Sequence, residues 1–354
     1  MSYCISLRGA YCMKISIYTL GCKANYCDSE SMAAIFAAKG HEVELGLCDA
    51  DVCIINTCSV TKYSDHKSRQ AVAKALRISP NAGVYVVGCS AENDSTQFGR
   101  YAIAGISGTY GKEELAKKIA AELGGGQNPR RLKSRKRGFV KIQDGCDNYC
   151  TYCIVPYLRG ISRSRSIDDI VTEAADKSKA ASEIVLSGIN IAAYGQDLDE
   201  KTDLTDLVEA LGVVDIPKRL GSLSPTVIDN NLLAAIKTNG IVTQFHMPLQ
   251  SGSDKILGLM GRRYTAGQYI QKVQLIRKMI PNASITTDVI VGFPGETEED
   301  FGDTVSVVRE VGFDKVHTFP FSARAGTKAY DMPSKIDERV IKDRLSRLDT
   351  YIKP

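Results

Sequence analysis

Short apolar runs alternate with longer amphipathic runs along most of this chain. In its first part, three runs rich in β-branched residues predict strands, and segments with helical spacing follow them. The strands are expected at Lys14–Leu20, Val52–Thr57 and Val84–Val87, and the helices at Ser29–Lys39, His66–Arg77 and Lys112–Glu122. Alternating β and α elements predict a parallel sheet with helices on its faces.

Longer units of the same kind follow from Gly138 onwards. Six strands are expected there: Phe139–Gln143, Glu183–Ile189, Arg219–Ser222, Gln244–Leu249, Ser284–Val291 and Lys315–Pro320. Helices between and after them include Ile167–Ser178, Ala266–Met279, Glu298–Val311 and Ile336–Tyr351. Six βα units predict an open, partial barrel of parallel strands, and chemistry in such folds gathers at the carboxyl ends of the strands.

These patterns divide the chain into five expected parts. Residues 1–12 are read as an upstream extension before a start at Met13, and 13–124 as an α/β domain. A Gly-rich, basic linker at 125–137 leads to the partial barrel at 138–332 and to a C-terminal helix at 333–354. The basic run Arg130–Arg137 is either a solvated hinge or a strap that contacts phosphate groups.

Composition and charge narrow the class of protein. The 354 residues carry a formal net charge of +4, and 44% are hydrophobic and 24% charged. These ordinary globular values exclude a disordered chain, a collagen or a coiled coil. No apolar run approaches the roughly 18 residues of a membrane helix, so no membrane contact is expected. Eleven cysteines spread through a long α/β chain predict reduced thiols or metal ligands in a cytoplasmic protein.

Three cysteines lie close together just after the first strand of the second part. Cys146, Cys150 and Cys153 have the spacing C-x3-C-x2-C. Three thiolates on one loop can hold an iron–sulfur cluster, whereas a closed zinc site needs four ligands. The next candidate ligand downstream is His246. The spacing therefore leaves three interpretations open: an iron–sulfur cluster, a zinc site completed from a distance, or incidental thiols.

Three further cysteines each follow a predicted strand of the first part. Cys22, Cys58 and Cys89 are 36 and 31 residues apart, about one βα unit each. The carboxyl ends of parallel strands meet at one edge of a sheet, where ligands bind. The three thiols are therefore expected to converge on a second metal centre. The alternative is that cysteine is simply common in buried strands, which suits Cys48 and Cys53, and Cys27 on a turn or helix start.

Several motifs together resemble those of the radical S-adenosylmethionine (SAM) methylthiotransferases, from about residue 13 to the end of the chain. They are Gly21-Cys22-Lys23-x-Asn25, Asn56-Thr57-Cys58, Gly88-Cys89, Gly145–Cys153 with Ile154–Gly160 behind it, Leu249–Ser253 and Asp288–Thr297. In two places the chain departs from the family, because Tyr26 and Glu92 stand where glutamine is usual. The family's C-terminal RNA-binding TRAM domain is expected to be absent, since the chain stops at Pro354.

The resemblance implies two 4Fe–4S clusters with different tasks. Cys146, Cys150 and Cys153 would hold the cluster that binds SAM and splits it into a 5′-deoxyadenosyl radical. Cys22, Cys58 and Cys89 would hold an auxiliary cluster that carries sulfur. The radical would remove hydrogen from carbon 2 of an adenine in tRNA, and a methylthio group would replace it. No catalytic residue beyond the cluster ligands is assigned. An electron donor such as flavodoxin or ferredoxin and a monomeric state are expected.

Other site residues are expected from their places at strand ends. The residues expected to bind SAM are Gly188, Asn190, Gln250, Ser251 and Gly292. The alternative is that they are loop glycines or residues that cap strand ends. His246 and His317 are expected to be barrel residues with hydrogen-bonding partners rather than ligands. Arg159 and Arg324 are expected to contact the substrate, through a tRNA phosphate or the threonylcarbamoyl carboxylate. The alternative is that they contact only solvent.

The family has three branches, which modify isopentenyladenosine in tRNA, threonylcarbamoyladenosine in tRNA, or an aspartate of a ribosomal protein. The segments Arg163–Arg165, Arg219–Pro225 and Phe319–Thr327 look most like the threonylcarbamoyladenosine branch. The alternatives are the isopentenyladenosine branch and a zinc-dependent RNA-binding protein without catalysis.

Overall fold

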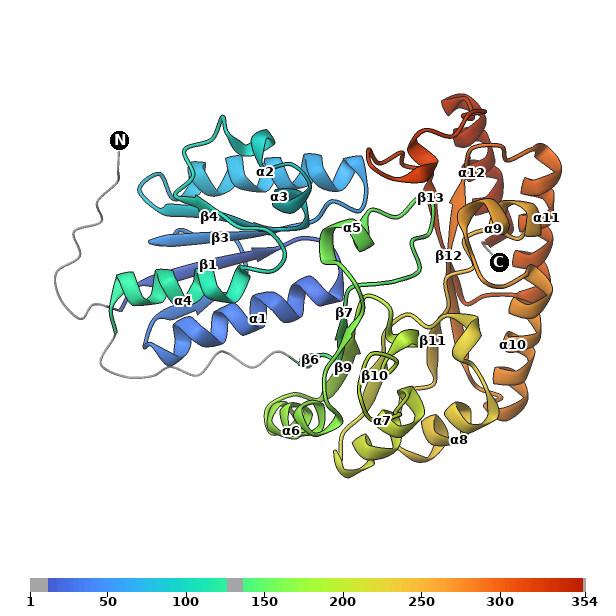
Figure 1. The fold of residues 1–354 in the computed structure, drawn as a ribbon, viewed down its shortest axis with the longest axis horizontal. Coiled ribbons are helices and arrows are strands. Elements are labelled where there is room, and N and C mark those ends of the chain that lie inside the picture. Colours follow the sequence, from blue (N-terminus) through green and yellow to red (C-terminus); the bar gives the residue numbers. More distant parts are fainter. Residues whose placement is uncertain (1–11, 126–135, 353–354) are drawn as a thin grey trace. The chain divides into compact units, whose positions relative to one another are not determined.

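The computed structural model describes residues 12–125 and 136–352 (Figure 1). Contacts divide the chain into two compact units, Met1–Ser134 with Tyr157–Arg159, and Arg135–Pro156 with Gly160–Pro354. The expected upstream extension and most of the basic run lie outside the described residues. The five expected parts stay a prediction, and each unit is described by itself.

The first unit is built on a five-stranded parallel sheet with the strand order β2-β1-β3-β4-β5. The strands are β1 (Lys14–Thr19), β2 (Glu42–Glu44), β3 (Val52–Thr57), β4 (Gly83–Gly88) and β5 (Gly105–Ile106). The expected parallel sheet is confirmed. Sequence reasoning missed the edge strands β2 and β5, because two or three residues are too few to show a strand period.

Helices cover both faces of this sheet (Figure 1). On one face lie α1 (Lys23–Ala38) and α4 (Lys112–Leu123), and on the other lie α2 (Lys62–Ile78) and α3 (Cys89–Asn93), which precedes the short helix η1 (Ser95–Phe98). Successive strand residues point to opposite faces. Ile54 therefore packs in the core with Phe36 of α1, whereas Cys53 and Ile55 pack in the core with Val72 of α2.

Two helices begin earlier than expected. Helix α1 starts at Lys23 rather than Ser29, so Cys22 is its N-cap residue and Cys27 lies inside it. Its first turns hide the helical pattern, because they bury polar residues such as Asn25 and Asp28 among small apolar ones. Helix α2 starts at Lys62 because the side chain of its N-cap residue, Thr61, accepts a hydrogen bond from the Ser64 backbone N–H.

The second unit contains the six expected parallel strands. They are β6 (Arg137–Lys141), β9 (Glu183–Ser187), β10 (Lys218–Leu220), β11 (Gln244–His246), β12 (Ser284–Val291) and β13 (Lys315–Pro320). They form the sheets β10-β9-β6 and β11-β12-β13, which the parallel bridges Lys218↔Ile241 and Ser222↔His246 connect. Within residues 136–352 no pairing between β6 and β13 closes the sheet, which is the arrangement of the expected partial barrel.

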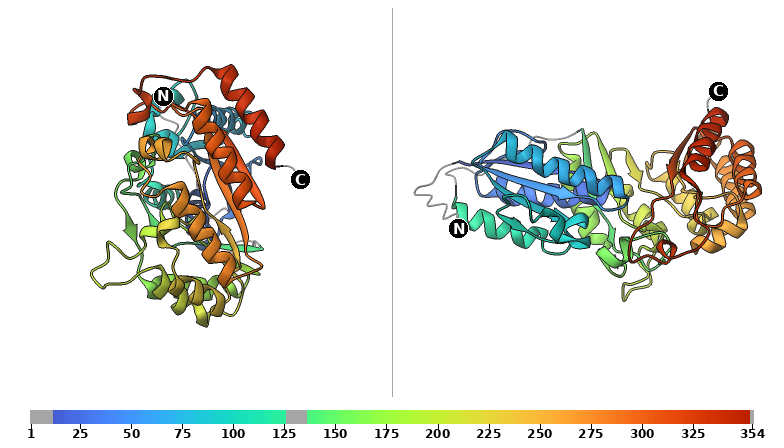
Figure 2. Two further views of the ribbon diagram at one scale, coloured as in Figure 1. Left: turned by 90° about the vertical axis from the view of Figure 1, so that its right-hand side faces the viewer. Right: turned by 90° about the horizontal axis from the view of Figure 1, so that it is seen from above.

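Helices follow most of these strands. They are α6 (Ile167–Ser178), α7 (Leu204–Ala210), α8 (Asn230–Thr238), α9 (Asp254–Met260), α10 (Ala266–Met279), α11 (Glu298–Val311) and α12 (Glu338–Ile352), with short 3-10 turns at 191–193, 211–213, 225–227 and 328–330. The bounds of α6, α10 and α11 are those expected. Helix α11 packs against α10 and α12, and α12 also packs against β12 and β13 (Figure 2). An antiparallel pair of β7 (Gln143–Asp144) and β8 (Arg163–Ser164) follows β6.

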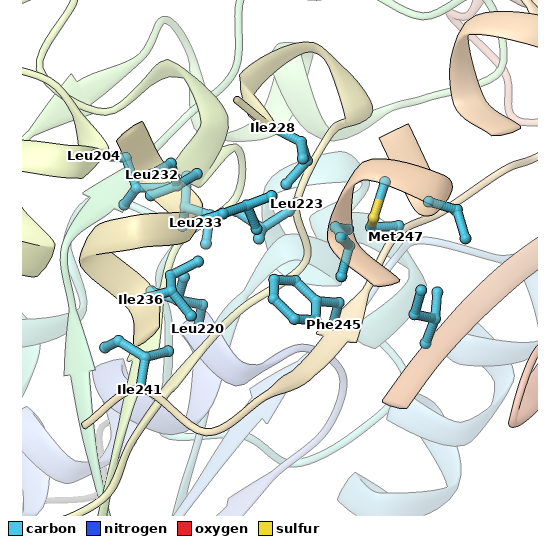
Figure 3. Close-up of a cluster of buried hydrophobic side chains, with 14 of the residues drawn as sticks. Leu204, Leu220, Leu223, Ile228, Leu232, Leu233, Ile236, Ile241, Phe245 and Met247 are labelled. Carbon is cyan, nitrogen blue, oxygen red and sulfur yellow. The ribbon is translucent and has the colours of Figure 1, made fainter. Parts of the chain in front are cut away.

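The apolar core of the second unit lies between the strands and the helices. Figure 3 shows part of it, where Leu232, Leu233 and Ile236 of α8 gather with Leu220 and Phe245 of the strands. Asp288 of β12 and His317 of β13 are only partly buried. Among the described helices, none combines the length and apolar composition that a bilayer crossing requires.

Candidate metal centres

The structure brings the three strand-end cysteines of the first unit together. Strands β1, β3 and β4 are direct neighbours in the sheet, and Cys22, Cys58 and Cys89 follow them at the same edge. The Cys58 thiol is close enough to both Cys22 and Cys89 to interact with them electrostatically. Cys58 and Cys89 are buried and Cys22 is exposed. The three thiols therefore form one group with an open side.

Glycine precedes two of these cysteines in the left-handed backbone region. Gly21 has φ +93° and Gly88 has φ +94°. A Cβ at Gly21 would lie 2.7 Å from the sulfur of Cys58, and a Cβ at Gly88 would lie 2.6 Å from Asn56 Oδ1. Any larger residue would be both strained and too close. Gly21 thus keeps space beside the Cys58 thiol, and Gly88 lets its chain pass close to Asn56 and Thr57.

Hydrogen bonds between polar side chains and the backbone tie the three strand ends to one another. Asn25 Nδ2 donates to the carbonyls of Leu20 (2.8 Å) and Thr57 (2.9 Å), and Asn56 Nδ2 donates to the Asn25 carbonyl (2.9 Å). Thr57 Oγ1 donates to the Val87 carbonyl at 2.6 Å. These buried bonds fix the loops that carry the cysteines.

A buried group of charges lies beside the same cysteines. Asp28 Oδ2 accepts hydrogen bonds from Lys112 Nζ (2.6 Å) and from Arg159 Nη2 (3.3 Å). Both cations also reach Asn25 Oδ1, at 3.2 and 2.5 Å, and the Arg159 guanidinium interacts electrostatically with the Cys89 thiol. Sequence reasoning assigned Arg159 to the substrate, but the structure buries its side chain to 2% exposure within the first unit.

Sequence reasoning did not single out Asp28 or Lys112. Each is a polar residue near the start of a helix, a position that is usually exposed to solvent. Nothing in their spacing indicates that they meet, because 84 residues separate them.

The second unit holds the other cysteine triplet on one loop. Cys146 N–H donates to the Gly160 carbonyl (3.0 Å), and Cys153 N–H donates to the Cys150 carbonyl (2.9 Å). Gly145, directly before the first cysteine, has φ +76°, and a Cβ there would lie 1.9 Å from the Ile161 carbonyl oxygen. The Cys153 thiol interacts electrostatically with those of Cys150 and Cys146. This unit therefore also gathers three thiols.

An arginine that sequence reasoning missed contacts the second triplet. Arg262 Nη1 lies 3.5 Å from the sulfur of Cys150. Its Nε donates to the Tyr264 hydroxyl at 3.0 Å, and its guanidinium lies over the Tyr264 ring, 4.9 Å from the centroid. The Tyr264 hydroxyl in turn donates to the Pro248 carbonyl at 2.9 Å. The pair Arg262-Arg263 after α9 was the sequence signal, but it did not show which arginine turns inward.

The donor chemistry of both triplets fits a cubane cluster. Burial raises the pKa of Cys58 to about 11 and that of Cys153 to about 12, so without metal these thiols keep their protons, and coordination would remove them. Among the described residues no three His, Cys, Asp or Glu side chains are arranged to hold one metal ion. A single zinc ion would need such a group, whereas a cubane binds each thiolate through a different iron.

One buried side chain connects the cluster loop to two expected SAM residues. Gly188 and Asn190 follow β9, and the Oε1 of Gln143 accepts a hydrogen bond from the Asn190 N–H at 2.8 Å. The Nε2 of Gln143 donates to the Gly145 carbonyl at 2.7 Å. A Cβ at Gly188 would lie 3.0 Å from Gln143 Oε1. Sequence reasoning missed Gln143, although it ends a predicted strand as the other candidates do.

The remaining expected SAM residues differ in their surroundings. Gln250 has φ +67° and pairs with β12 through its backbone, donating to the Asp288 carbonyl at 2.8 Å. Gly292 directly follows β12, and its N–H donates to Glu296 Oε2 at 2.7 Å. Ser251 is fully buried, and its hydroxyl accepts from the Ser253 N–H at 3.2 Å. The Ser251 side chain is therefore engaged within the protein.

The two histidines and the second arginine have distinct places. His246 Nδ1 lies 2.8 Å from Ser222 Oγ, and its Nε2 lies 3.2 Å from Asp288 Oδ1. The His317 ring is 6.2 Å from that of His246. Both ring nitrogens of His246 thus lie within hydrogen-bonding distance of a side chain. Arg324 is 6% exposed, and its carbonyl accepts a 2.7 Å hydrogen bond from Thr327 Oγ1.

Each unit matches a family of known proteins. Residues 140–308 match the Radical SAM superfamily, and residues 14–104 match a family described as "Uncharacterized protein family UPF0004". Among solved structures, the cobalamin-dependent S-adenosylmethionine radical enzyme OxsB aligns with a TM-score of 0.58 at 12% identity, over 96% of this chain and 56% of that one. This likeness shows a shared fold.

Two relatives are similar over nearly the whole chain. A tRNA-2-methylthio-N(6)-dimethylallyladenosine synthase of Bacillus subtilis (strain 168) is 37% identical, covering 96% of this chain and 72% of the relative. The threonylcarbamoyladenosine tRNA methylthiotransferase MtaB of the same organism is 34% identical, covering 94% and 79%. The chain therefore belongs to the radical SAM tRNA methylthiotransferases, and its cofactors are SAM and two 4Fe–4S clusters.

Proposed function

We propose that this enzyme adds a methylthio group to carbon 2 of N6-threonylcarbamoyladenosine in tRNA. The observation that carries the proposal is the pair of cysteine triplets, one in each unit, each with three thiols and a preceding left-handed glycine. Three protein ligands leave one iron of a 4Fe–4S cluster open to another molecule. Two such sites suit a reaction that needs both SAM and a sulfur atom.

In this proposal the two triplets have separate tasks. Cys146, Cys150 and Cys153 hold the cluster that binds SAM, and Cys22, Cys58 and Cys89 hold the cluster that carries sulfur. When bound, SAM and its cluster supply a radical that removes hydrogen from an unactivated aromatic carbon, which no acidic or basic side chain does. The protein's own side chains hold and orient the reactants and shield them from water.

The residues of the second unit divide into those that we propose contact SAM and those that hold the contacting residues in place. Gly188 and Gly292 directly follow β9 and β12, and Asn190 and Gln250 lie a few residues beyond β9 and β11. We propose that the backbones of these residues and the Asn190 side chain contact SAM. Gln143 positions Asn190 relative to the cluster loop, because its side chain hydrogen-bonds both the Asn190 N–H and the Gly145 carbonyl. For Ser251 we propose a supporting role, because its hydroxyl is engaged with Ser253.

A polar row on the sheet of the second unit favours the threonylcarbamoyl substrate. Ser222, His246 and Asp288 are hydrogen-bonded in series, and His317 lies next to His246. Polar and partly exposed side chains suit a nucleoside that carries hydroxyl and carboxylate groups better than one that carries an apolar isopentenyl group. Arg324 stays a proposed contact to the carboxylate of the substrate.

The dimethylallyladenosine branch is the second candidate. It is favoured by relatives of that name, which are 35–37% identical against 34% for the threonylcarbamoyladenosine enzyme. Mass spectrometry of nucleosides from tRNA of a strain that lacks this gene distinguishes the two. We expect the methylthio form of threonylcarbamoyladenosine to disappear. Loss of the methylthio form of isopentenyladenosine instead would assign the enzyme to the other branch.

We also propose a monomeric, cytoplasmic enzyme with a small one-electron donor such as flavodoxin or ferredoxin. Purified enzyme with SAM and each donor in turn tests the donor, with 5′-deoxyadenosine as the measured product. Equal product without any protein donor would contradict this part of the proposal.

A further inference from the structure

Three charged side chains beside the strand-end cysteines are almost completely buried. Asp28, Lys112 and Arg159 are 6%, 3% and 2% exposed. These three side chains bring two cations and one anion together. Burying charges is expensive, and ion pairs of this kind seldom stabilise a fold more than apolar residues would. A second negative group beside them would account for the arrangement.

The cysteines supply that negative charge when they bind a cluster. The Arg159 guanidinium and the Lys112 ammonium both interact electrostatically with the Cys89 thiol. Both cations also bond to Asn25 Oδ1, and Asn25 Nδ2 bonds to the Thr57 carbonyl directly before Cys58. Three thiolates lower the net charge of a bound cluster, and net charge together with hydrogen bonds to the sulfurs sets the reduction potential of iron–sulfur centres. The two cations are therefore placed where they favour the extra electron of the reduced cluster.

We propose that Lys112 and Arg159 are positioning residues that set the charge and the reduction potential of the cluster held by Cys22, Cys58 and Cys89, and that Asp28 holds the two cations and moderates their effect. This inference rests on the proposed function, because it takes that triplet as the ligand set. It gives Arg159 a role inside the first unit in place of a contact with tRNA.

The test isolates the cluster of the first unit in the full chain. Cys146, Cys150 and Cys153 are replaced by alanine, the protein is reconstituted without oxygen, and the remaining cluster is titrated with dithionite and followed by electron paramagnetic resonance. Into this background we introduce Arg159→Met, Lys112→Met and Asp28→Asn. The charge-keeping variants are Arg159→Lys and Lys112→Arg. Lys218→Met is the matched control, since Lys218 is a buried cation of the second unit that bonds to the Leu211 and Val214 carbonyls.

The expected shifts have opposite signs. Removing either cation should lower the ratio of reduced to oxidised cluster at a fixed potential by about tenfold, which is 59 mV for a one-electron couple. Asp28→Asn should raise that ratio, and the charge-keeping variants and Lys218→Met should leave it near the parent value. If charge sets the potential, removing a cation and removing the anion should shift the ratio in opposite directions. Lost packing would not change direction with the sign of the removed charge.

Two results would overturn the inference. One is an unchanged potential, or a shift in the same direction, for Arg159→Met and Asp28→Asn. The other is loss of iron from the charge-keeping variants as fully as from the methionine variants, which would make shape rather than charge the requirement. If the triple-alanine background itself binds no iron, the assignment of the triplet in the proposed function fails, and this inference fails with it.

Discussion

The two cysteine triplets resemble each other locally but are built in different ways. In each unit a glycine with positive φ stands directly before a cysteine, as at Gly21 and Gly145. In each unit a buried or half-buried arginine also reaches one thiol, Arg159 at Cys89 and Arg262 at Cys150. The second triplet spans eight residues of one loop, whereas the first collects its thiols from three strand ends.

This difference shows where each site is vulnerable. The first triplet depends on the register of β1, β3 and β4, because a shift of one strand would move one thiol away from the other two. The second depends on local loop geometry and on its anchor to the end of α9, where Thr151 N–H donates to the Met260 carbonyl at 3.0 Å. Their arginines also have different partners, a carboxylate for Arg159 and a phenol for Arg262.

The largest expected effect comes from Cys146→Ala. Because the loop triplet has no spare ligand, this variant should lose one cluster and all cleavage of SAM while the other triplet keeps its iron. Iron per chain should fall from about eight to about four, as two cubanes require. Iron analysis and assay of 5′-deoxyadenosine measure both effects, with Cys27→Ala as the control. Reductive cleavage of SAM by Cys146→Ala would refute the assignment.

Cys58→Ala should give the complementary result. Methylthio product should disappear, because the three strand-end thiols act as one site, whereas cleavage of SAM stays measurable. Cys53→Ala is the matched control, since Cys53 lies on β3, the strand that Cys58 follows, but is fully buried in the core under α2. It should keep both clusters. Normal methylthiolation by Cys58→Ala would show that the three thiols do not form one centre.

Gly21→Ala should separate strain from crowding at the first triplet. The new Cβ adds the strain of a left-handed backbone, about 1–2 kcal/mol, and also meets the sulfur of Cys58. Gly124→Ala adds similar strain at φ +77° with nothing within 4 Å of the Cβ. Both should lower the thermal midpoint of unfolding, but only Gly21→Ala should lose iron from the first unit. Equal iron in the two variants would mean that Gly21 serves only the backbone.

The smallest effect is expected from Arg262→Met. A hydrogen bond to a charged group contributes about 1.5–3 kcal/mol, so its loss should slow cleavage of SAM by at least about tenfold without loss of iron. Arg262→Lys, which keeps the charge, should recover part of the rate. The potential of the second-unit cluster, measured in a background without the strand-end cysteines, should fall in Arg262→Met. An unchanged rate and potential would leave Arg262 a packing residue against Tyr264.

The sequence by itself determined the parts of this protein that are encoded locally. The alternation of apolar and amphipathic runs predicted the parallel sheet and the six strands of the second unit, because strand and helix periods repeat over a few residues. The loop triplet is read directly from its spacing. The strand-end triplet needed only one further step, since parallel strands end at a common edge.

The tertiary structure alone decided which polar side chains meet. Asp28, Lys112 and Arg159 come from α1, α4 and the segment after Cys153, and Arg159 is 131 residues from Asp28 in the sequence. The early start of α1 was hidden because its first turns bury polar groups rather than an apolar stripe. Periodicity reports burial of apolar surface, whereas buried charges are specified by partners that only the folded chain brings into contact.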